Sequence, residues 1–194
     1  MKNLTGMSKD IGEVKAEINN LGKDLMKINK DLDDLGQYMR RDCVEIVGVK
    51  ANSPEECYKI VIAIAKDMGI ALEPKDISTS HPLQVAKGKG DKFIVKFTRR
   101  DTKDRFYSNL KKVAGRKPCN LPTVKNVLPT SDRKLYVCES LTPLRKKLFG
   151  LVNEARKQLK WEFIWTNNGK VYIKKNEESG TTIIDSLDDL TMEN

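Results

Sequence analysis

An apolar side chain recurs every three or four residues through the first 39 residues, and this repeat constrains the fold more than any other feature of the chain. The steps alternate 3, 4, 3, 4 without a break, so the mean period is 3.5 residues. A helix with this period presents one narrow apolar seam, and such helices supercoil around one another to bury it. The seam positions are Leu4, Met7, Ile11, Val14, Ile18, Leu21, Leu25, Ile28, Leu32, Leu35 and Met39. Residues 1–40 are therefore predicted to form a coiled coil that makes the protein a homo-oligomer.

The seam favours three strands over two. Dimers prefer β-branched side chains at the a positions with Leu at d, whereas both sets are mixed here if Leu4 is the first a position. The alternative is one amphipathic helix packed on its own domain, but such helices usually carry a wider stripe with a period of about 3.6 residues. The residues predicted to hold the strands together are Ile11, Val14, Ile18, Leu21, Leu25, Ile28, Leu32 and Leu35.

Charge is distributed unevenly along the 194 residues. Residues 1–39 hold 6 Lys and 7 acidic residues, and residues 176–194 hold 6 acidic residues and no base. The middle of the chain, 40–175, therefore keeps 30 bases and 14 acids, a net charge of +16. An excess of this size predicts a polyanionic partner, and it favours nucleic acid over a merely soluble basic surface.

Motifs of other function classes are missing from the sequence. The cysteines Cys43, Cys57, Cys119 and Cys138 have no zinc-site spacing and are typical of buried thiols in a reducing compartment. His81 is the single histidine, and no hydrolase, P-loop or metalloprotease motif occurs. No apolar run is long enough to span a membrane. We therefore expect an intracellular protein, cytoplasmic or nuclear, that is not an enzyme, has no cofactor or metal and does not insert into membranes.

Residues 41–128 show the element order of a split βαβ domain, β-α-β-β-α-β, which RNA-recognition motifs (RRMs) use. Ser53, Pro54 and Glu56 form a capping-box pattern that marks the start of the first helix. The predicted elements are the strand 43–49, the helix 53–69, the strands 76–81 and 92–98, the helix 102–113 and a weakly marked strand near 121–127.

Residues 129–194 are predicted to form a small α+β C-terminal domain with a β-hairpin and an acidic tail, which makes the whole chain α+β. The run 167–169, Asn-Asn-Gly, is a strong hairpin signal. The predicted elements are the strand 135–138, the helix from 142 to about 160, the hairpin strands 161–166 and 170–175, and an edge strand at 181–184. Trp161, Phe163 and Trp165 form either a core face, which we prefer, or a stacking platform.

Several segments carry a family likeness. After a coiled coil, Arg40–Val49 and Phe93–Thr98 resemble the open-reading-frame-1 proteins of LINE retrotransposons. Leu135–Pro143, Phe163–Lys175 and Ile184–Leu190 resemble the C-terminal domain of baculovirus few-polyhedra (FP) proteins and their transposon relatives in insects and cnidarians. The resemblance implies a trimeric RNA-coating protein with nucleic-acid chaperone activity in a retroelement, or a structural or trafficking role in a virus.

Alternation along the strand 92–98 places Phe93, Val95 and Phe97 in the core. The open face is then Lys92, Ile94 and Lys96, with Glu45 on the first strand where RRMs usually offer an aromatic side chain. This favours phosphate binding over base readout. The candidate contacts are Arg40, Arg41, Lys87, Lys89, Lys96, Arg99, Arg100, Lys103, Arg116, Lys117, Lys170, Tyr172, Lys174 and Lys175.

The pairs 40–41, 99–100 and 116–117 are preferred because they lie at the ends of predicted elements, where they can converge; the alternative for each is a solvated surface charge. The sequence thus predicts an oligomer that binds single-stranded RNA, or DNA, largely independently of sequence. The alternative is a structural or trafficking adaptor that binds a protein through its acidic tail and hairpin.

Overall fold

The computed structural model describes residues 2–84, 91–128, 133–186 and 189 of the chain. It consists of two compact units, Met1–Tyr38 and Met39–Asn194.

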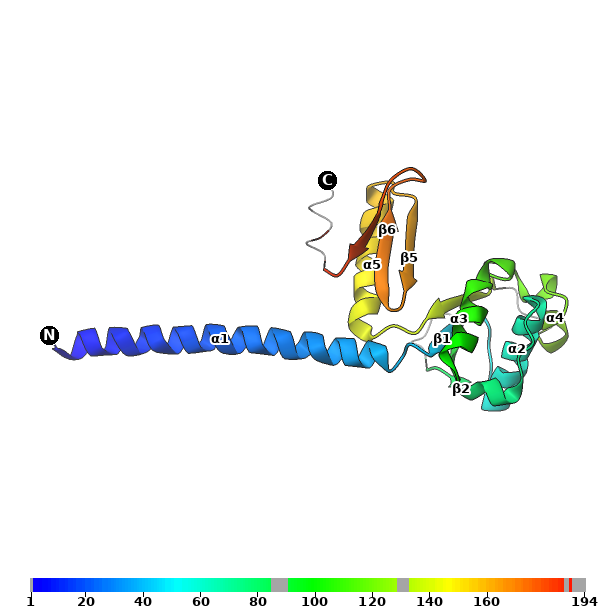
Figure 1. Ribbon diagram of the computed structural model, residues 1–194, viewed down its shortest axis with the longest axis horizontal. Coiled ribbons are helices and arrows are strands. Elements are labelled where there is room, and N and C mark those ends of the chain that lie inside the picture. Colours follow the sequence, from blue (N-terminus) through cyan, green and yellow to red (C-terminus); the bar gives the residue numbers. More distant parts are fainter. Residues whose placement is uncertain (1, 85–90, 129–132, 187–188, 190–194) are drawn as a thin grey trace. The chain divides into compact units, whose positions relative to one another are not determined.

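The first unit is one continuous helix, α1 (Lys2–Tyr38), shown in blue in Figure 1. The seam residues from Met7 to Leu35 are each between 53% and 65% exposed. Removing apolar surface from water is favourable by roughly 25 cal/mol per Å², so an exposed stripe of this length favours association with another apolar surface. The predicted helix is confirmed, and its pairing with other copies stays a prediction.

Four strands of the second unit form an antiparallel sheet in the order β2-β3-β1-β4. Helices α2 and α3 follow β1 and β3 along the chain. The elements are β1 (Cys43–Val47), α2 (Pro54–Asp67), β2 (Ile77–Pro82), β3 (Lys92–Phe97), α3 (Arg100–Ser108) and β4 (Tyr136–Glu139), with short 3-10 turns η1 (Pro74–Asp76), η2 (Leu110–Lys112) and η3 (Pro118–Asn120) between them.

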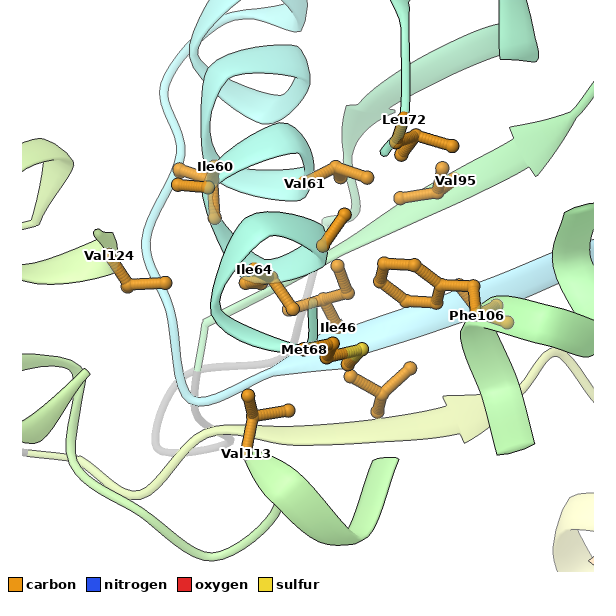
Figure 2. Close-up of a cluster of buried hydrophobic side chains, with 14 of the residues drawn as sticks. Ile46, Ile60, Val61, Ile64, Met68, Leu72, Val95, Phe106, Val113 and Val124 are labelled. Atoms are coloured by element: carbon orange, nitrogen blue, oxygen red, sulfur yellow. The ribbon is translucent and has the colours of Figure 1, made fainter. Parts of the chain in front are cut away.

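The main core lies between this sheet and its helices, as Figure 2 shows. Ile60, Ile64 and Met68 from the α2 segment are each at most 1% exposed. The rings of Phe97 and Phe106 lie 5.3 Å apart, which joins β3 to α3. The predicted core face of β3 is confirmed, because Phe93, Val95 and Phe97 are also at most 1% exposed.

Residues 121–127 do not form the predicted strand. They contain the short helix α4 (Val124–Val127), which packs against α2. The Asp67 carboxylate accepts hydrogen bonds from the backbone N–H groups of Thr123 (2.8 Å) and Val124 (3.0 Å), and these bonds fix the start of α4. The fourth place in the sheet belongs instead to β4, where Val137 lies opposite Ile46. From the sequence, this strand was predicted to belong to the C-terminal domain.

The rest of the chain forms a helix and a second antiparallel sheet in the order β5-β6-β7. These elements are α5 (Pro143–Gln158), β5 (Phe163–Asn167), β6 (Lys170–Lys174) and β7 (Thr181–Ile184). The predicted hairpin and edge strand are confirmed. Asn168 and Gly169 have φ values of 52° and 76°, as a two-residue type I′ turn requires. Val152 of α5 packs with Val171, Ile173 and Ile184 in a second, smaller core.

The N-cap of α2 gives a first testable prediction. Ser53 Oγ accepts a hydrogen bond from the N–H of Glu56 at 3.2 Å, as the sequence pattern predicts. Replacing Ser53 with Ala should lower the free energy of unfolding by about 1 kcal/mol, because that N–H loses its acceptor. Chemical denaturation would measure the loss. The matched control is Ser78→Ala, at an exposed position of β2, which should change stability by less than about 0.5 kcal/mol. Equal losses in the two variants would contradict the capping role.

Candidate nucleic-acid interface

The side chain of Glu139, at the end of β4, binds the turn of the β5–β6 hairpin. Its carboxylate accepts hydrogen bonds from the backbone N–H of Asn168 at 2.9 Å and of Gly169 at 3.0 Å. It also accepts one from Lys103 Nζ of α3 at 3.2 Å. Glu139 and Lys103 are 5% and 2% exposed, so each charge is removed from water and depends on its partner. The same contacts join the second sheet to the first.

Two arginines complete the anchoring of this turn. Arg100 Nη2 donates to Asn168 Oδ1 at 2.9 Å, and Arg145 Nη1 of α5 donates to the Gly169 carbonyl at 3.0 Å. The turn therefore contacts α3, β4 and α5, and the position of the hairpin within this unit is fixed by polar contacts at its tip. The Asn-Gly sequence predicted this turn, but no sequence pattern indicated that Glu139, Arg100 and Arg145 would contact it.

Tyr107 of α3 lies beside this polar group. Lys103 Nζ is 4.9 Å from the centre of its ring. Burial, together with the negative charge of Glu139, raises the pKa of Tyr107 to about 12, although a hydrogen bond with Thr166 acts in the opposite direction. The phenol therefore stays neutral at physiological pH and can keep its contact with β5.

The open face of the first sheet centres on Glu45, which is 6% exposed. Its carboxylate pairs with Lys146 of α5 at 2.5 Å and with Lys92 of β3 at 3.3 Å. Ser140 Oγ donates to it at 3.3 Å. Glu45 and Lys92 were predicted on this face from the sequence, but Lys146 was not, because its approach depends on the packing of α5.

Ile94 and Cys138 flank Glu45 in the strand register of this face. On this side of the described strands β1 and β3, the side chains therefore do not repeat the usual RRM pattern of central aromatic residues; the exposed Tyr136 lies on the edge strand β4, opposite Val47. A pocket of about 440 Å³ adjoins the face. Its lining residues are Glu45, Val47, Lys92, Tyr107, Val137, Cys138, Glu139, Leu141, Lys146, Phe149, Trp165 and Thr166.

Two of the three predicted basic pairs share one end of the sheet. Strands β1 and β3 are antiparallel, so the start of one lies beside the end of the other. The N–H of Phe97 donates to the Asp42 carbonyl at 2.9 Å, which brings residues 40–41 close to residues 99–100. Because Arg100 contacts the hairpin turn, Lys170 also belongs to this end. We call Arg40, Arg41, Arg99, Arg100 and Lys170 the basic end.

The third pair, Arg116 and Lys117, lies elsewhere. The N–H of Leu135 donates to the Arg116 carbonyl at 2.9 Å, so this pair adjoins the start of β4. Strand β4 pairs antiparallel with β1, as β3 does, so its start lies at the opposite end of the sheet from residues 99–100. Both side chains are exposed, but the structure does not bring them to the basic end.

The other predicted contacts have three different environments. Lys96 is exposed on the open face of β3. The prediction that Lys103 contacts nucleic acid is wrong, because its buried ammonium pairs with Glu139 and does not reach the surface. Lys87 and Lys89 lie outside the described residues. Lys174 is partly exposed, and its Nζ donates to the backbone carbonyl of Glu177. Lys175 is exposed, and its Nζ lies 5.2 Å from the centre of the Trp161 ring.

Aromatic side chains occupy the side of the second sheet that faces away from α5, which we call the outer face. Phe163 and Trp165 are 39% and 36% exposed, whereas their neighbour Ile164 packs against the smaller core. Our preference for a core position was therefore wrong for both residues. Trp161 precedes the strand and does pack against that core. The regular series Ile164, Val171, Ile173 was the signal in the sequence for the buried side.

The cysteines and metal ligands can also be checked over the described ranges. All four cysteines are free, and Cys43 and Cys57 are buried, but Cys119 and Cys138 are exposed, contrary to expectation. No group of three or more His, Cys, Asp or Glu side chains in those ranges is arranged to hold a metal ion. In the same ranges, no helix combines the length and apolarity that crossing a bilayer requires.

Residues 142–192 match the family model described as Baculovirus FP protein domain 2. The match begins at Thr142, whose Oγ1 accepts a hydrogen bond from the N–H of Arg145 and caps α5, and it continues through the second sheet. It supports the FP part of the resemblance seen in the sequence. No curated protein matches the chain.

Proposed function

We propose that this protein is a homo-oligomer that binds single-stranded nucleic acid, RNA above all, through its phosphates and with little sequence preference. The observation that carries the proposal is the net charge of +16 on residues 40–175. Five of these bases lie at the basic end, where Arg41, Arg99 and Arg100 also face the carboxylates of Asp42, Asp101 and Asp104. Phosphate contacts supply most of the affinity in sequence-independent binding, because each one releases condensed counterions. Nucleic-acid chaperone activity in a retroelement or viral ribonucleoprotein would follow from such binding.

The topology of the first sheet supports an RRM-like platform. Its order β2-β3-β1-β4, with helices after β1 and β3, is the order that the split βαβ arrangement produces. On its open face, Glu45 lies between Ile94 and Cys138, in place of side chains that could stack on bases. A buried carboxylate also repels phosphate unless its lysine partners screen it. The proposal therefore assigns binding to the basic end and not to the centre of this sheet.

The exposed seam of α1 supports the oligomeric part of the proposal, with a trimer favoured over a dimer. One basic end offers only a few phosphate contacts. Two or three copies joined by one stalk would hold several of them on the same strand, and each later contact would become intramolecular. The stalk would thus raise affinity without touching the nucleic acid.

A salt titration with two matched double variants tests whether nucleic acid binds at the basic end. Binding of a mixed-sequence single strand should weaken with salt, with a log–log slope of about −0.7 for each phosphate contact. The double variant Arg99→Gln/Lys170→Gln should flatten the slope by about 1.4, because it removes two contacts from the basic end. The control Arg116→Gln/Lys117→Gln removes the same charge from the other end of the sheet and should change the slope less.

Fluorescence anisotropy with a labelled oligonucleotide would give each slope. A slope near zero for the parent protein, or no binding at low salt, would contradict the proposed function. Equal changes in the two double variants would show that only total charge matters, and that outcome would contradict the assignment to the basic end.

A further inference from the structure

The outer face of the second sheet alternates aromatic and basic side chains. Along β6, Lys170, Tyr172 and Lys174 point to this side, as every second residue of a strand does. Across the sheet, Trp165 lies opposite Tyr172 and Phe163 lies opposite Lys174. On the third strand, Ile183 lies opposite Tyr172 and Thr181 opposite Lys174. Among these described positions of the outer face, none carries an acidic side chain.

Packing against α5 does not account for these aromatic residues. The smaller core uses the other side of the sheet, where Val171, Ile173 and Ile184 are at most 2% exposed. Figure 1 shows α5 beside β5 and β6, and within the second sheet this helix packs on those two strands. On the outer face, by contrast, Phe163, Trp165 and Ile183 are 39%, 36% and 42% exposed. Contiguous exposed apolar side chains with polar neighbours commonly mark a binding surface.

The geometry of the aromatic pair suits a flat ligand. The rings of Trp165 and Tyr172 are stacked, with 5.6 Å between their centres and 10° between their planes. Two rings that are already parallel and held by neighbouring strands lose little freedom when a third ring stacks beside them. Trp165 also lines the 440 Å³ pocket, so the space next to it is open to a ligand.

Charge complementarity identifies the class of ligand. Residues two apart on a strand are about 6.8 Å apart, so β6 places a positive charge on either side of Tyr172. A ligand that combines flat rings with regularly spaced negative charges matches this pattern, and single-stranded nucleic acid has both. Lys170 belongs to the outer face and also to the basic end. The two surfaces are therefore continuous, and one strand can contact both.

We infer that the outer face stacks the unpaired bases of single-stranded nucleic acid. Trp165 and Tyr172 form the stacking surface, Phe163 extends it, and Lys170 and Lys174 contact the flanking phosphates. This inference rests on the proposed function and adds to it a contribution from the bases. Because every base has a π face, such stacking tolerates any sequence and is consistent with binding of little sequence preference.

Two ligands with the same number of phosphates, one with bases and one without, distinguish base stacking from phosphate binding. The first is a 20-nucleotide oligo(dT), and the second is an abasic chain of the same length. The parent protein should bind oligo(dT) more tightly than the abasic chain. The double variant Trp165→Leu/Tyr172→Leu keeps apolar bulk but removes both rings, and it should weaken oligo(dT) binding by about 5- to 150-fold per stacked base. Its affinity for the abasic chain should be unchanged.

Ile183→Ala is the matched control, because it removes apolar surface from the same face without removing a ring. Because it removes no π face, it should weaken oligo(dT) binding far less than the double variant does, and its affinity for the abasic chain should match that of the parent. If the double variant fails to fold, Phe163→Leu supplies a milder test with the same expected direction. A second readout is fluorescence in a Trp161→Phe background, where Trp165 is the remaining tryptophan and oligo(dT), but not the abasic chain, should quench it.

The possible failures are distinguishable. Failure of the parent to bind either ligand at low salt would overturn the proposed function and this inference together. Equal binding of the two ligands by the parent would overturn the inference alone, as would equal losses for both ligands in the double variant. If oligo(dT) left Trp165 fluorescence unchanged while binding with full affinity, the outer face would not be its binding site.

Discussion

Replacing Ile18 and Leu25 with Asp should convert the protein into a monomer that binds long single-stranded RNA about 10² to 10⁴ times more weakly. Both residues occupy the seam of α1, where they are 60% exposed in one chain. In an oligomer these positions would be buried, so two Asp residues would place unpaired charges in an apolar seam. The monomer should keep its folded second unit, and with it the weak binding of a single basic end.

The matched control is Asn19→Asp/Asn20→Asp, which adds the same two charges to α1 at positions outside the seam. It should stay oligomeric and bind with nearly the affinity of the parent. Sedimentation equilibrium would report the mass of each variant, and a filter-binding titration with a long RNA would report affinity. A seam variant that became monomeric yet bound long RNA as tightly as the parent would show that the stalk takes no part in binding. A seam variant that kept the mass of the parent would contradict the coiled coil itself.

The elements with strong local signals could be predicted from the sequence. The unbroken 3.5-residue repeat identified the long helix, and Asn168-Gly169 identified the hairpin turn. Alternation along β3 identified the buried phenylalanines. In each case the pattern reflects a property of the element itself, such as the period of a helix or the positive φ that a tight turn requires.

The fourth strand could not be assigned correctly for a physical reason. Residues 121–127 are apolar enough to be a strand, but the buried residues Leu121 and Val124 pack against α2, and Asp67 holds the start of α4. The true strand, β4, is only four residues long and pairs along one edge with β1. A short strand is defined by its long-range partner, which local sequence does not encode.

The candidate site was predictable in its charge but not in its burial. Lys103 is one of several basic residues at the start of α3, and nothing in its neighbours shows that it turns inward. Its burial depends on Glu139, which is 36 residues away in the chain. The outer face was misjudged because Trp161 was grouped with Phe163 and Trp165, although the strand begins only at Phe163.

The Glu139 contacts lead to the second large effect. Replacing Glu139 with Ala should lower the free energy of unfolding by about 3 to 5 kcal/mol, the usual cost of removing one partner from a buried ion pair. The buried Lys103 ammonium would keep only the exposed carboxylate of Asp104, at 3.4 Å, and the N–H groups of Asn168 and Gly169 would lose their acceptor. For a chain of this size the loss corresponds to a decrease in Tm of about 6 to 20 °C.

Further variants distinguish the cost of breaking the Lys103–Glu139 ion pair from the cost of losing the hydrogen bonds to the turn. Glu139→Gln keeps the volume and one carbonyl acceptor, so its loss should be smaller than that of Glu139→Ala. Adding Lys103→Met to Glu139→Ala should restore part of the stability, because the interior then no longer holds an ammonium whose buried partner has been removed. Glu178→Ala is the control, since this acid is exposed and should change stability by less than about 0.5 kcal/mol. If Glu139→Ala were no more destabilising than this control, the carboxylate would not hold the hairpin turn. If Lys103→Met restored nothing, the cost would come from the turn N–H groups and not from the buried ammonium.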